Sequence, residues 1–249
     1  MMADPMLEVL GLTKCFGAVT ASDGLTFNVK RGEIHALIGP NGAGKSTTIG
    51  QLTGEIKPDS GRVRFDGRDI TRYAIHKRAA IGLQRSYQIT SLFPAFTALD
   101  NVAMAIQAQQ SHSFQFWRPA RTDDRLRAPA RLALKRLGME DLADLKVTEL
   151  AHGEQRQLEV AMALATAPTM LLLDEPMAGM GQGESRRMME ILRPLKGDIT
   201  ILLVEHDMDV VFALADVVTV LVKGAVLMTG TPDEVRADPE VRRAYLGDG

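Results

Sequence analysis

Hydrophobic residues follow two different patterns along the chain, one toward both ends of the sequence and another in the middle. Short segments that are alternately or continuously apolar predict strands, and they occupy residues 6–10, 25–29, 34–38, 62–67, 170–173, 199–204, 217–222 and 225–228. Across residues 94–165 the apolar positions instead repeat with helical spacing, and Ala, Leu, Arg and Met dominate. The pattern therefore predicts an α/β protein with a helical insertion.

The second half of the chain contains a strand–helix–strand unit. Residues 170–173 and 199–204 are apolar at nearly every position, as parallel strands covered on both faces require. A helical pattern over 184–195 separates them, so the three segments predict a βαβ unit. Lys223-Gly224 predicts a final hairpin, and two helix starts follow it at Thr231-Pro232 and Asp238-Pro239.

Composition restricts the class of protein. The chain has 249 residues, 45% hydrophobic and 24% charged, with a formal net charge of −2, which gives no general case for nucleic-acid binding. No apolar run reaches the roughly 20 residues that cross a bilayer, and Met1–Met6 does not resemble a signal peptide. The single cysteine, Cys15, excludes an internal disulfide, and we expect it to be a small buried side chain.

A glycine-rich motif lies between the apolar segment 34–38 and a helix start predicted near Gly44. It fits the Walker A pattern of a phosphate-binding loop (P-loop) and consists of Gly39, Pro40, Asn41, Gly42, Ala43, Gly44, Lys45, Ser46 and Thr47. Its backbone N–H groups and the dipole of the following helix favour an anion. We expect Lys45 to reach the β- and γ-phosphates of a nucleoside triphosphate and Ser46 to ligate Mg²⁺. A chance glycine-rich turn would lack this strand and helix.

Two acidic residues follow the apolar segment 170–173. Asp174, at the strand tip, suits the Mg²⁺-holding role of a Walker B aspartate. Glu175, one residue further, lies where it can polarise a water aimed at the γ-phosphate. Two acids after a strand mean little alone, but together with a Walker A loop they predict triphosphate hydrolysis.

The order of these motifs resembles that of ATP-binding-cassette (ABC) ATPases, and the resemblance covers nearly the whole chain. It implies an ABC-type P-loop ATPase fold, with a mixed sheet core, an N-terminal antiparallel β subdomain and an inserted α-helical subdomain. Residues 1–249 then form a single ABC ATPase domain. In it, 1–93 and 166–249 are the RecA-like core with the β subdomain, and 94–165 are the helical subdomain. The implied cofactors are ATP and Mg²⁺.

Further residues match family motifs. The family's signature motif, which lies against the γ-phosphate held by a partner subunit, corresponds to Ala151, His152, Gly153 and Glu154. Gly153 alone could be a helix-entry glycine, but its position before the Walker B strand favours the signature.

Three more positions carry roles that the resemblance implies. Gln88 matches the Q-loop glutamine, which senses Mg²⁺ and the attacking water; Gln84 is a nearby competitor, but the sequence that follows favours Gln88. His206, just after the strand 199–204, matches the switch histidine that contacts the γ-phosphate. Phe16 matches the aromatic residue on which adenine stacks, and its alternative is a packed core phenylalanine.

Several residues depart from the family pattern. Ala151 replaces the signature serine, Glu154 replaces a glutamine, and the D-loop, which usually ends in Asp, reads Ala178-Gly179-Met180-Gly181. All of these positions act across the dimer interface. We therefore hypothesise a heterodimer with a second ABC ATPase subunit that has a better signature. If backbone N–H groups suffice for binding, these side chains matter little and a homodimer remains possible.

Smaller features resemble one subgroup, the ATPase subunits of prokaryotic importers for branched-chain amino acids, urea or short amides. These features lie in the signature, around Asp174 and His206, and in the ending Arg243-Ala244-Tyr245-Leu246-Gly247. The ATPase of a lipopolysaccharide-type exporter shares the ending and is the nearest alternative. The resemblance implies transmembrane permease subunits that dock near Ser91-Leu92-Phe93 and hold this chain on the cytoplasmic face of the membrane. It implies no direct contact with the transported substrate.

Two other function classes fit these motifs less well than a transporter subunit does. A soluble cassette protein acting on ribosomes or DNA would carry two cassettes or a long coiled coil, and this chain has neither. A module that only senses ATP would not need the general base Glu175.

A basic stretch over 118–136 allows contact with anionic lipid headgroups, although a solvated helix face is its commoner meaning. We place Pro129 in the first turn of a helix that runs to Gly138, and we expect Phe114, Phe116 and Trp117 to anchor the insertion.

Overall fold

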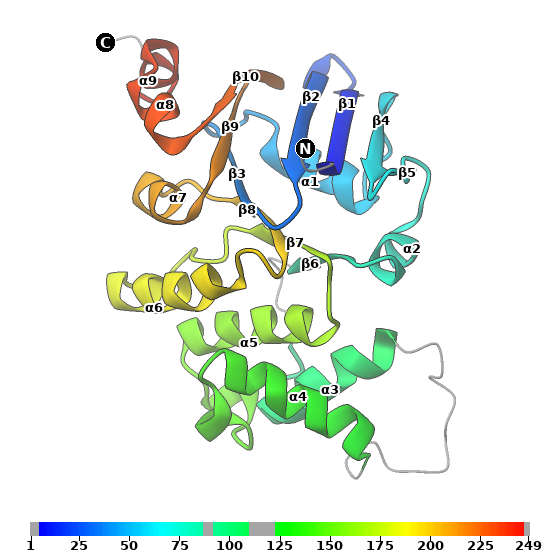
Figure 1. Cartoon of the computed structure of the whole chain (residues 1–249), viewed down its shortest axis with the longest axis vertical. Coiled ribbons are helices and arrows are strands. Elements are labelled where there is room, and N and C mark those ends of the chain that lie inside the picture. The colour runs from blue at the N-terminus through cyan, green and yellow to red at the C-terminus, as the bar shows by residue number, and fades with distance from the viewer. Residues whose placement is uncertain (1–4, 87–91, 110–122, 247–249) are drawn as a thin grey trace. The chain divides into compact units, whose positions relative to one another are not determined.

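The computed structural model describes residues 5–86, 92–109 and 123–246. Within these residues, contacts divide the chain into two compact units (Figure 1). The first unit contains the chain up to Gln84, Thr169–Glu175 and the part from Leu192 onward. The second contains Arg85–Pro168 and Pro176–Ile191. The sequence predicts a single domain made of a core with the β subdomain (1–93 and 166–249) and a helical subdomain (94–165). This division stays a prediction.

An antiparallel sheet in the first unit has the strand order β2-β1-β4-β5. Its strands are β1 (Pro5–Phe16), β2 (Val19–Lys30), β4 (Ser60–Phe65) and β5 (Arg68–Asp69). The strands β1 and β2 are longer than the apolar pattern predicts, because their paired ends form an exposed hairpin that has no core to fill. Cys15 lies exposed in this hairpin, so the expectation of a buried cysteine is wrong.

A mixed sheet has the strand order β10-β9-β3-β8-β7-β6. Its strands are β3 (Ile34–Ile38), β6 (Leu83–Ser86), β7 (Met170–Asp174), β8 (Thr200–Val204), β9 (Val217–Val222) and β10 (Ala225–Gly230). The neighbours β7, β8, β3 and β9 pair in parallel, and β10 returns antiparallel to β9 through the predicted hairpin. Every residue of β3, β7 and β8 is buried, as flat apolar runs predict.

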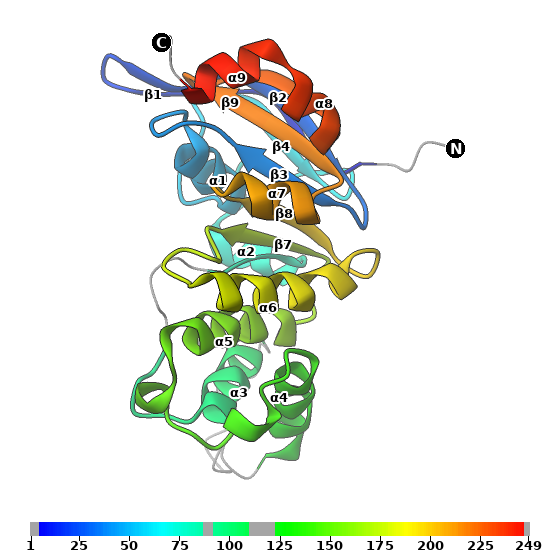
Figure 2. The same ribbon diagram turned by 90° about the vertical axis from the view of Figure 1, so that its left-hand side faces the viewer.

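The α-helices of the first unit are α1 (Lys45–Thr53), α2 (Ile75–Ala80), α7 (Met208–Leu214), α8 (Pro232–Ala237) and α9 (Pro239–Leu246). One apolar core joins the antiparallel sheet to α1 and the mixed sheet, with Leu7, Phe27, Ile49 and Leu172 among its members. A second cluster lies under α7, α8 and α9, which Figure 1 and Figure 2 show side by side along β9. The strand β3 contributes to both clusters and is therefore the centre of this unit.

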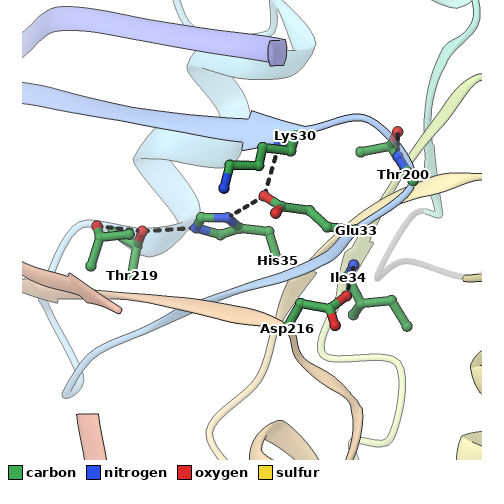
Figure 3. A network of polar contacts seen from close by, with 9 residues as sticks. Lys30, Glu33, Ile34, His35, Thr200, Asp216 and Thr219 are labelled. Carbon is green, nitrogen blue, oxygen red and sulfur yellow. Dashed lines mark hydrogen bonds and ion pairs between the residues drawn. The ribbon is translucent and has the colours of Figure 1, made fainter. Parts of the chain in front are cut away.

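Polar contacts hold β3 in register at its N-terminal end (Figure 3). The imidazole of His35, fully buried, lies 3.0 Å from Glu33 Oε1 through Nδ1 and 2.8 Å from Thr219 Oγ1 through Nε2. The N–H of Ile34 donates to Asp216 Oδ2 at 3.0 Å. Because buried polar groups stabilise only when they are paired, these contacts favour one alignment of β3 with β9.

The second unit is helical. It consists mainly of α3 (Ala98–Gln109), α4 (Asp124–Arg136), α5 (His152–Ala165) and most of α6 (Gln182–Leu192), with short 3₁₀ turns at Glu140–Leu142 and Val147–Glu149. A further turn, Arg193–Leu195, follows α6. The helices α3, α4 and α5 pack on one another through buried side chains such as Leu99, Leu134 and Leu158. None of the helices formed by described residues combines the length and hydrophobicity that a bilayer span requires.

The helix α4 corrects one prediction and bears on another. It begins at Asp124 with an Asp123 cap, so Pro129 lies inside the helix rather than in its first turn. The cap on Asp123 provides a stronger start than the proline, whose missing N–H leaves one helical bond unmade. In the basic stretch, Arg125, Arg127 and Lys135 pair with Asp123, Asp100 and Glu140, which favours the solvated-face interpretation. The residues Phe114, Phe116 and Trp117 lie outside the described part.

A buried arginine closes the C-terminal end of α1. The guanidinium of Arg78 donates to the carbonyl oxygens of Gln51, Leu52, Thr71 and Tyr73 at 2.6–3.0 Å. Burial lowers the pKa of Arg78 to about 10, so the group stays charged at neutral pH. The charge also suits the negative end of the helix dipole.

Replacing Arg78 by Met is expected to lower the free energy of unfolding by about 3 kcal/mol or more, because four buried carbonyls lose their donor. Urea unfolding followed by circular dichroism measures the change. The exposed Arg62 is the control, and its Arg62→Met variant should unfold within about 0.5 kcal/mol of the original chain. Equal stability of the two variants would contradict the role of Arg78.

Candidate nucleotide site

Three neighbouring strands of the mixed sheet end at one edge. Leu37 of β3 lies opposite Val204 of β8, and Val204 lies opposite Asp174 of β7. The P-loop begins at Gly39, directly after β3. Glu175 directly follows β7, and Glu205 and His206 directly follow β8. The parallel register therefore gathers the predicted Walker A, Walker B and switch residues at the same edge, where α/β proteins bind their ligands.

The P-loop curls into the first turn of α1. Lys45 begins this helix, and its ammonium donates to the carbonyl oxygens of Gly39 at 2.6 Å and Pro40 at 3.2 Å. The loop is fixed to the β9–β10 hairpin, because Gly224 N donates to the carbonyl of Ala43 at 3.0 Å. Ser46 is the next residue of α1 and is exposed, whereas Lys45 is buried.

Two glycines of this loop have a positive φ but differ in surroundings. Gly42 has φ +79° with open space where a Cβ would lie. Gly44, with φ +99°, is the residue before α1, and a Cβ there would overlap the carbonyl oxygen of Ala21 in β2. The loop therefore tolerates no side chain at residue 44, whereas residue 42 is restricted by its backbone angle alone.

Charges around Lys45 make this edge a site for an anion. Burial lowers the pKa of Lys45, while the carboxylates of Glu175 and Asp174 act in the opposite direction. A buried ammonium that is incompletely compensated by its neighbours gains from a bound phosphate. The structure therefore brings Lys45, Asp174 and Glu175 together, as the sequence predicts.

Glu175 and His206 lie beside each other. The distance from His206 Nδ1 to Glu175 Oε1 is 3.8 Å, and the imidazole is 63% exposed. Glu175 has φ +48°, unusual for a non-glycine residue, and its N–H donates to Val204 O at 2.8 Å. Such backbone strain is concentrated at functional positions. It points the main chain away from β7 directly after Asp174.

The fully buried carboxyl of Glu205 was not among the predicted site residues. Its Oε2 accepts the N–H of His206 at 3.2 Å and lies 3.8 Å from His206 Nδ1. An acidic residue that follows a buried strand is the signal that could have identified it, since Asp174 ends β7 in the same way. Glu205 therefore helps to position His206.

Phe16 lies at the end of β1 with 51% of its surface exposed. Its interpretation as a packed core residue is therefore wrong. The ammonium of Lys14 lies 5.4 Å from the ring centroid, within range of a cation–π contact. An exposed ring remains free to stack on a planar ligand.

In the second unit, the predicted signature residues form the start of α5. Glu154 Oε2 accepts the N–H of Ala151 at 2.9 Å and so caps its own helix. A Cβ on Gly153 would press against the Glu184 carboxylate, whose other oxygen accepts the N–H of Gly181 at 2.9 Å. The signature and the D-loop thus meet within this unit.

Gln88, with the Q-loop around it, lies outside the described residues. Among the residues that are described, no cluster of three or more His, Cys, Asp or Glu side chains could hold a metal ion.

Comparison with known proteins identifies the family. A family model described as "ABC transporter" matches residues 22–178, which include both Walker motifs and the signature. The chain belongs to the ABC transporter ATPase family. This cassette therefore binds and hydrolyses ATP, and the predicted fold is confirmed.

Relatives resemble the cassette over its whole length. It is 37% identical to the high-affinity branched-chain amino acid transport ATP-binding protein BraF of Pseudomonas aeruginosa, covering 99% of this chain and 100% of that protein. It is 36% identical to LivG of Escherichia coli, a protein of the same description, with equal coverage. A second family model, "Branched-chain amino acid ATP-binding cassette transporter", matches residues 225–249.

Solved structures of other cassettes have the same fold. A nucleotide-free ABC transporter cassette superposes with a TM-score of 0.87 at 31% identity, covering 98% of this chain and 100% of that one. The ADP conformation of the cassette MJ1267 also superposes with a TM-score of 0.87 at 31% identity. The match covers 98% of this chain and 99% of that one.

The two loop glycines provide a matched test of the P-loop geometry. Gly44→Ala is expected to weaken ATP binding at least 100-fold, because the loop must move away from Ala21. Gly42→Ala adds only the strain of a left-handed alanine, about 1–2 kcal/mol, and should weaken binding about tenfold. Titration with a fluorescent ATP analogue measures both, and circular dichroism confirms folding. A smaller loss at residue 44 than at residue 42 would show that the collision with Ala21 does not limit the loop.

Proposed function

We propose that this cassette powers the import of branched-chain amino acids. The observation that carries the proposal is the full-length similarity to BraF and LivG, together with the second family model over 225–249. These relatives do not favour the lipopolysaccharide-type exporter or the soluble cassette. ATP hydrolysis in this chain supplies the free energy, and separate permease subunits provide the path for the solute.

The site residues divide the chemistry among them. The P-loop amides and Lys45 bind the phosphates and neutralise their charge. Glu175 accepts a proton from the attacking water, and its position one residue beyond Asp174 directs it to the outside of the sheet. His206, placed beside Glu175 and supported by Glu205, donates to the γ-phosphate as charge develops there. Phe16, with its exposed ring, stacks on adenine.

The donor set fits Mg²⁺. The hydroxyl of Ser46 and the carboxylate of Asp174 are hard oxygen donors at the same sheet edge, and Asp174 is 6% exposed, so its charge acts in a poorly solvated place. Gln88 completes the proposed ligands. The ion would neutralise charge on the phosphate oxygens, and Ser46 and Asp174 would hold it against the P-loop.

A second subunit that completes the nucleotide site from outside this chain is supported by the dimeric ABC cassettes among the solved structures. We propose a heterodimer, since the signature of this chain is weak. The Ala151 N–H is already engaged by Glu154, and residue 151 has no hydroxyl to offer a phosphate. This chain's own ATP is then held by a partner with a better signature, and the reciprocal site turns over more slowly.

The permeases dock near Phe93 and hold the cassette on the cytoplasmic face of the membrane. The Phe93 side chain is 49% exposed, although its backbone is fixed by two hydrogen bonds with Asn101. Phe96 packs edge-on against it, with ring centroids 6.0 Å apart. A rigid backbone that presents an exposed aromatic pair suits the seat of a short apolar helix.

Uptake into proteoliposomes tests the proposed import. The cassette is reconstituted with its cognate permeases and binding protein, and uptake of labelled leucine, urea and acetamide is compared. ATP-dependent uptake of leucine at least tenfold above urea and acetamide is expected. Phe93→Ala should lower uptake while ATP binding by the purified chain stays unchanged. ATP-dependent efflux, or uptake of urea alone, would overturn the proposal.

The weak signature can be repaired by substitution. Ala151→Ser with Glu154→Gln is expected to raise ATP turnover of the purified chain alone by about tenfold, because both copies in a symmetric dimer then gain a phosphate donor. Steady-state phosphate release measures turnover. If the unaltered chain alone already forms symmetric ATP-bound dimers with full turnover, the proposed asymmetry fails.

A further inference from the structure

A small apolar cavity lies between α7 and the pair α8–α9, the three helices that Figure 2 shows along β9. Its volume is about 260 Å³. Apart from two arginines, it is lined by the side chains of Met208, Phe212, Val235, Val241 and Tyr245. Every lining residue belongs to the first unit, and none has a role in the ATP chemistry described above.

Two cations complete the lining of this cavity. The Arg236 guanidinium lies 4.4 Å from the centroid of the Phe212 ring, and Arg242 Nε donates to the carbonyl oxygen of Arg236 at 3.1 Å. Both side chains are exposed, and within the described residues neither forms an ion pair with a carboxylate. An apolar cavity with unneutralised cations suits a ligand that has an apolar body and a negative end.

Two of the lining residues, Met208 and Tyr245, lie close to residues of the nucleotide site. Met208 begins α7 only two residues after His206, and Asp207 between them caps that helix through Oδ1. The hydroxyl oxygen of Tyr245 is buried and faces the backbone amide of Gly39, the first P-loop residue. Burial raises the pKa of Tyr245, and the Gly39 amide partly opposes this.

The same helices share an apolar cluster with β3. Val235 and Val241 pack in one cluster with Ile38, the residue before Gly39, and Met208 and Tyr245 pack against it. A molecule in the cavity would therefore contact side chains that are coupled to His206 and to the P-loop.

We propose that this cavity binds a small apolar monocarboxylate and that binding slows ATP hydrolysis. The volume lies just below the roughly 300–1,000 Å³ of pockets for drug-sized ligands, so the ligand is small. The carboxylate binds Arg236 and Arg242. A free amino acid binds less well, because its ammonium group meets two guanidinium groups and no carboxylate in the lining.

The direction of the effect follows from the position of α7. In this structure His206 Nδ1 lies 3.8 Å from both Glu175 Oε1 and Glu205 Oε2. A ligand that packs on Met208 and Phe212 stabilises this position of α7, so His206 is less often available to the γ-phosphate. A ligand shifts an equilibrium only as far as it prefers one state, so we expect a lower kcat with little change in the KM for ATP.

Calorimetric titration of the purified full-length chain tests the ligand class. The probes are 4-methylpentanoate, its neutral amide 4-methylpentanamide, and L-leucine. The acid is expected to bind at least tenfold more tightly than the amide or leucine. Binding of acid and amide with equal affinity would overturn the proposal. So would the absence of acid binding at a concentration of about 10 mM.

A charge-removing variant locates the binding site. Arg236→Gln with Arg242→Gln should fold normally, because both side chains are exposed, and should weaken acid binding at least tenfold. The exposed Arg68, remote in sequence and outside the lining, supplies the control Arg68→Gln, which should bind the acid normally.

Turnover of the assembled transporter distinguishes regulation from binding alone. Saturating 4-methylpentanoate is expected to lower kcat at least twofold in the unaltered protein and in Arg68→Gln, and to leave the double variant unaffected. Equal slowing of the double variant would place the effect elsewhere. An unchanged kcat in the unaltered protein would contradict the regulatory role.

Discussion

Parallel pairing of β3, β8 and β7 is the interaction on which the nucleotide site depends. Because Leu37, Val204 and Asp174 lie side by side, three chain segments that are far apart in sequence leave the sheet at one edge. A shift of one residue in either pairing would turn each following side chain to the opposite face. The contacts of His35 with Thr219 of β9 and of Ile34 with Asp216, the residue before β9, hold β3 in register with β9, so they support the site without touching a nucleotide.

At this edge of the sheet, the fold holds several residues in unfavourable environments or backbone conformations. Lys45 is buried, Glu175 has a left-handed backbone, and Gly44 leaves no room for a side chain beside Ala21. Each condition costs stability, and the apolar cores on both sides of β3 offset it. In the proposed mechanism this arrangement places the P-loop and the base Glu175 before ATP arrives, so that less reorganisation is needed during hydrolysis.

Much of the site could be predicted because its motifs are local in sequence. The P-loop, Asp174, Glu175 and His206 each follow a recognisable apolar strand, and a strand ending shows where its next residue lies. Contacts between distant segments left no such signal. Nothing in the sequence indicates that Arg78 closes α1 or that Tyr245 faces Gly39. The exposed hairpin that carries Cys15 and Phe16 was also missed, because strand pairing continued past the apolar pattern.

The central claim is that Glu175 activates the water that attacks ATP held by this chain's own P-loop. The most direct test is turnover and ATP affinity of Glu175→Gln in the assembled transporter, measured together. Gln keeps the size of the side chain but cannot accept the proton, so turnover should fall at least about 100-fold while ATP affinity changes less than about threefold. The ATP-bound dimer should then accumulate. Undiminished hydrolysis by the variant would contradict the role of Glu175.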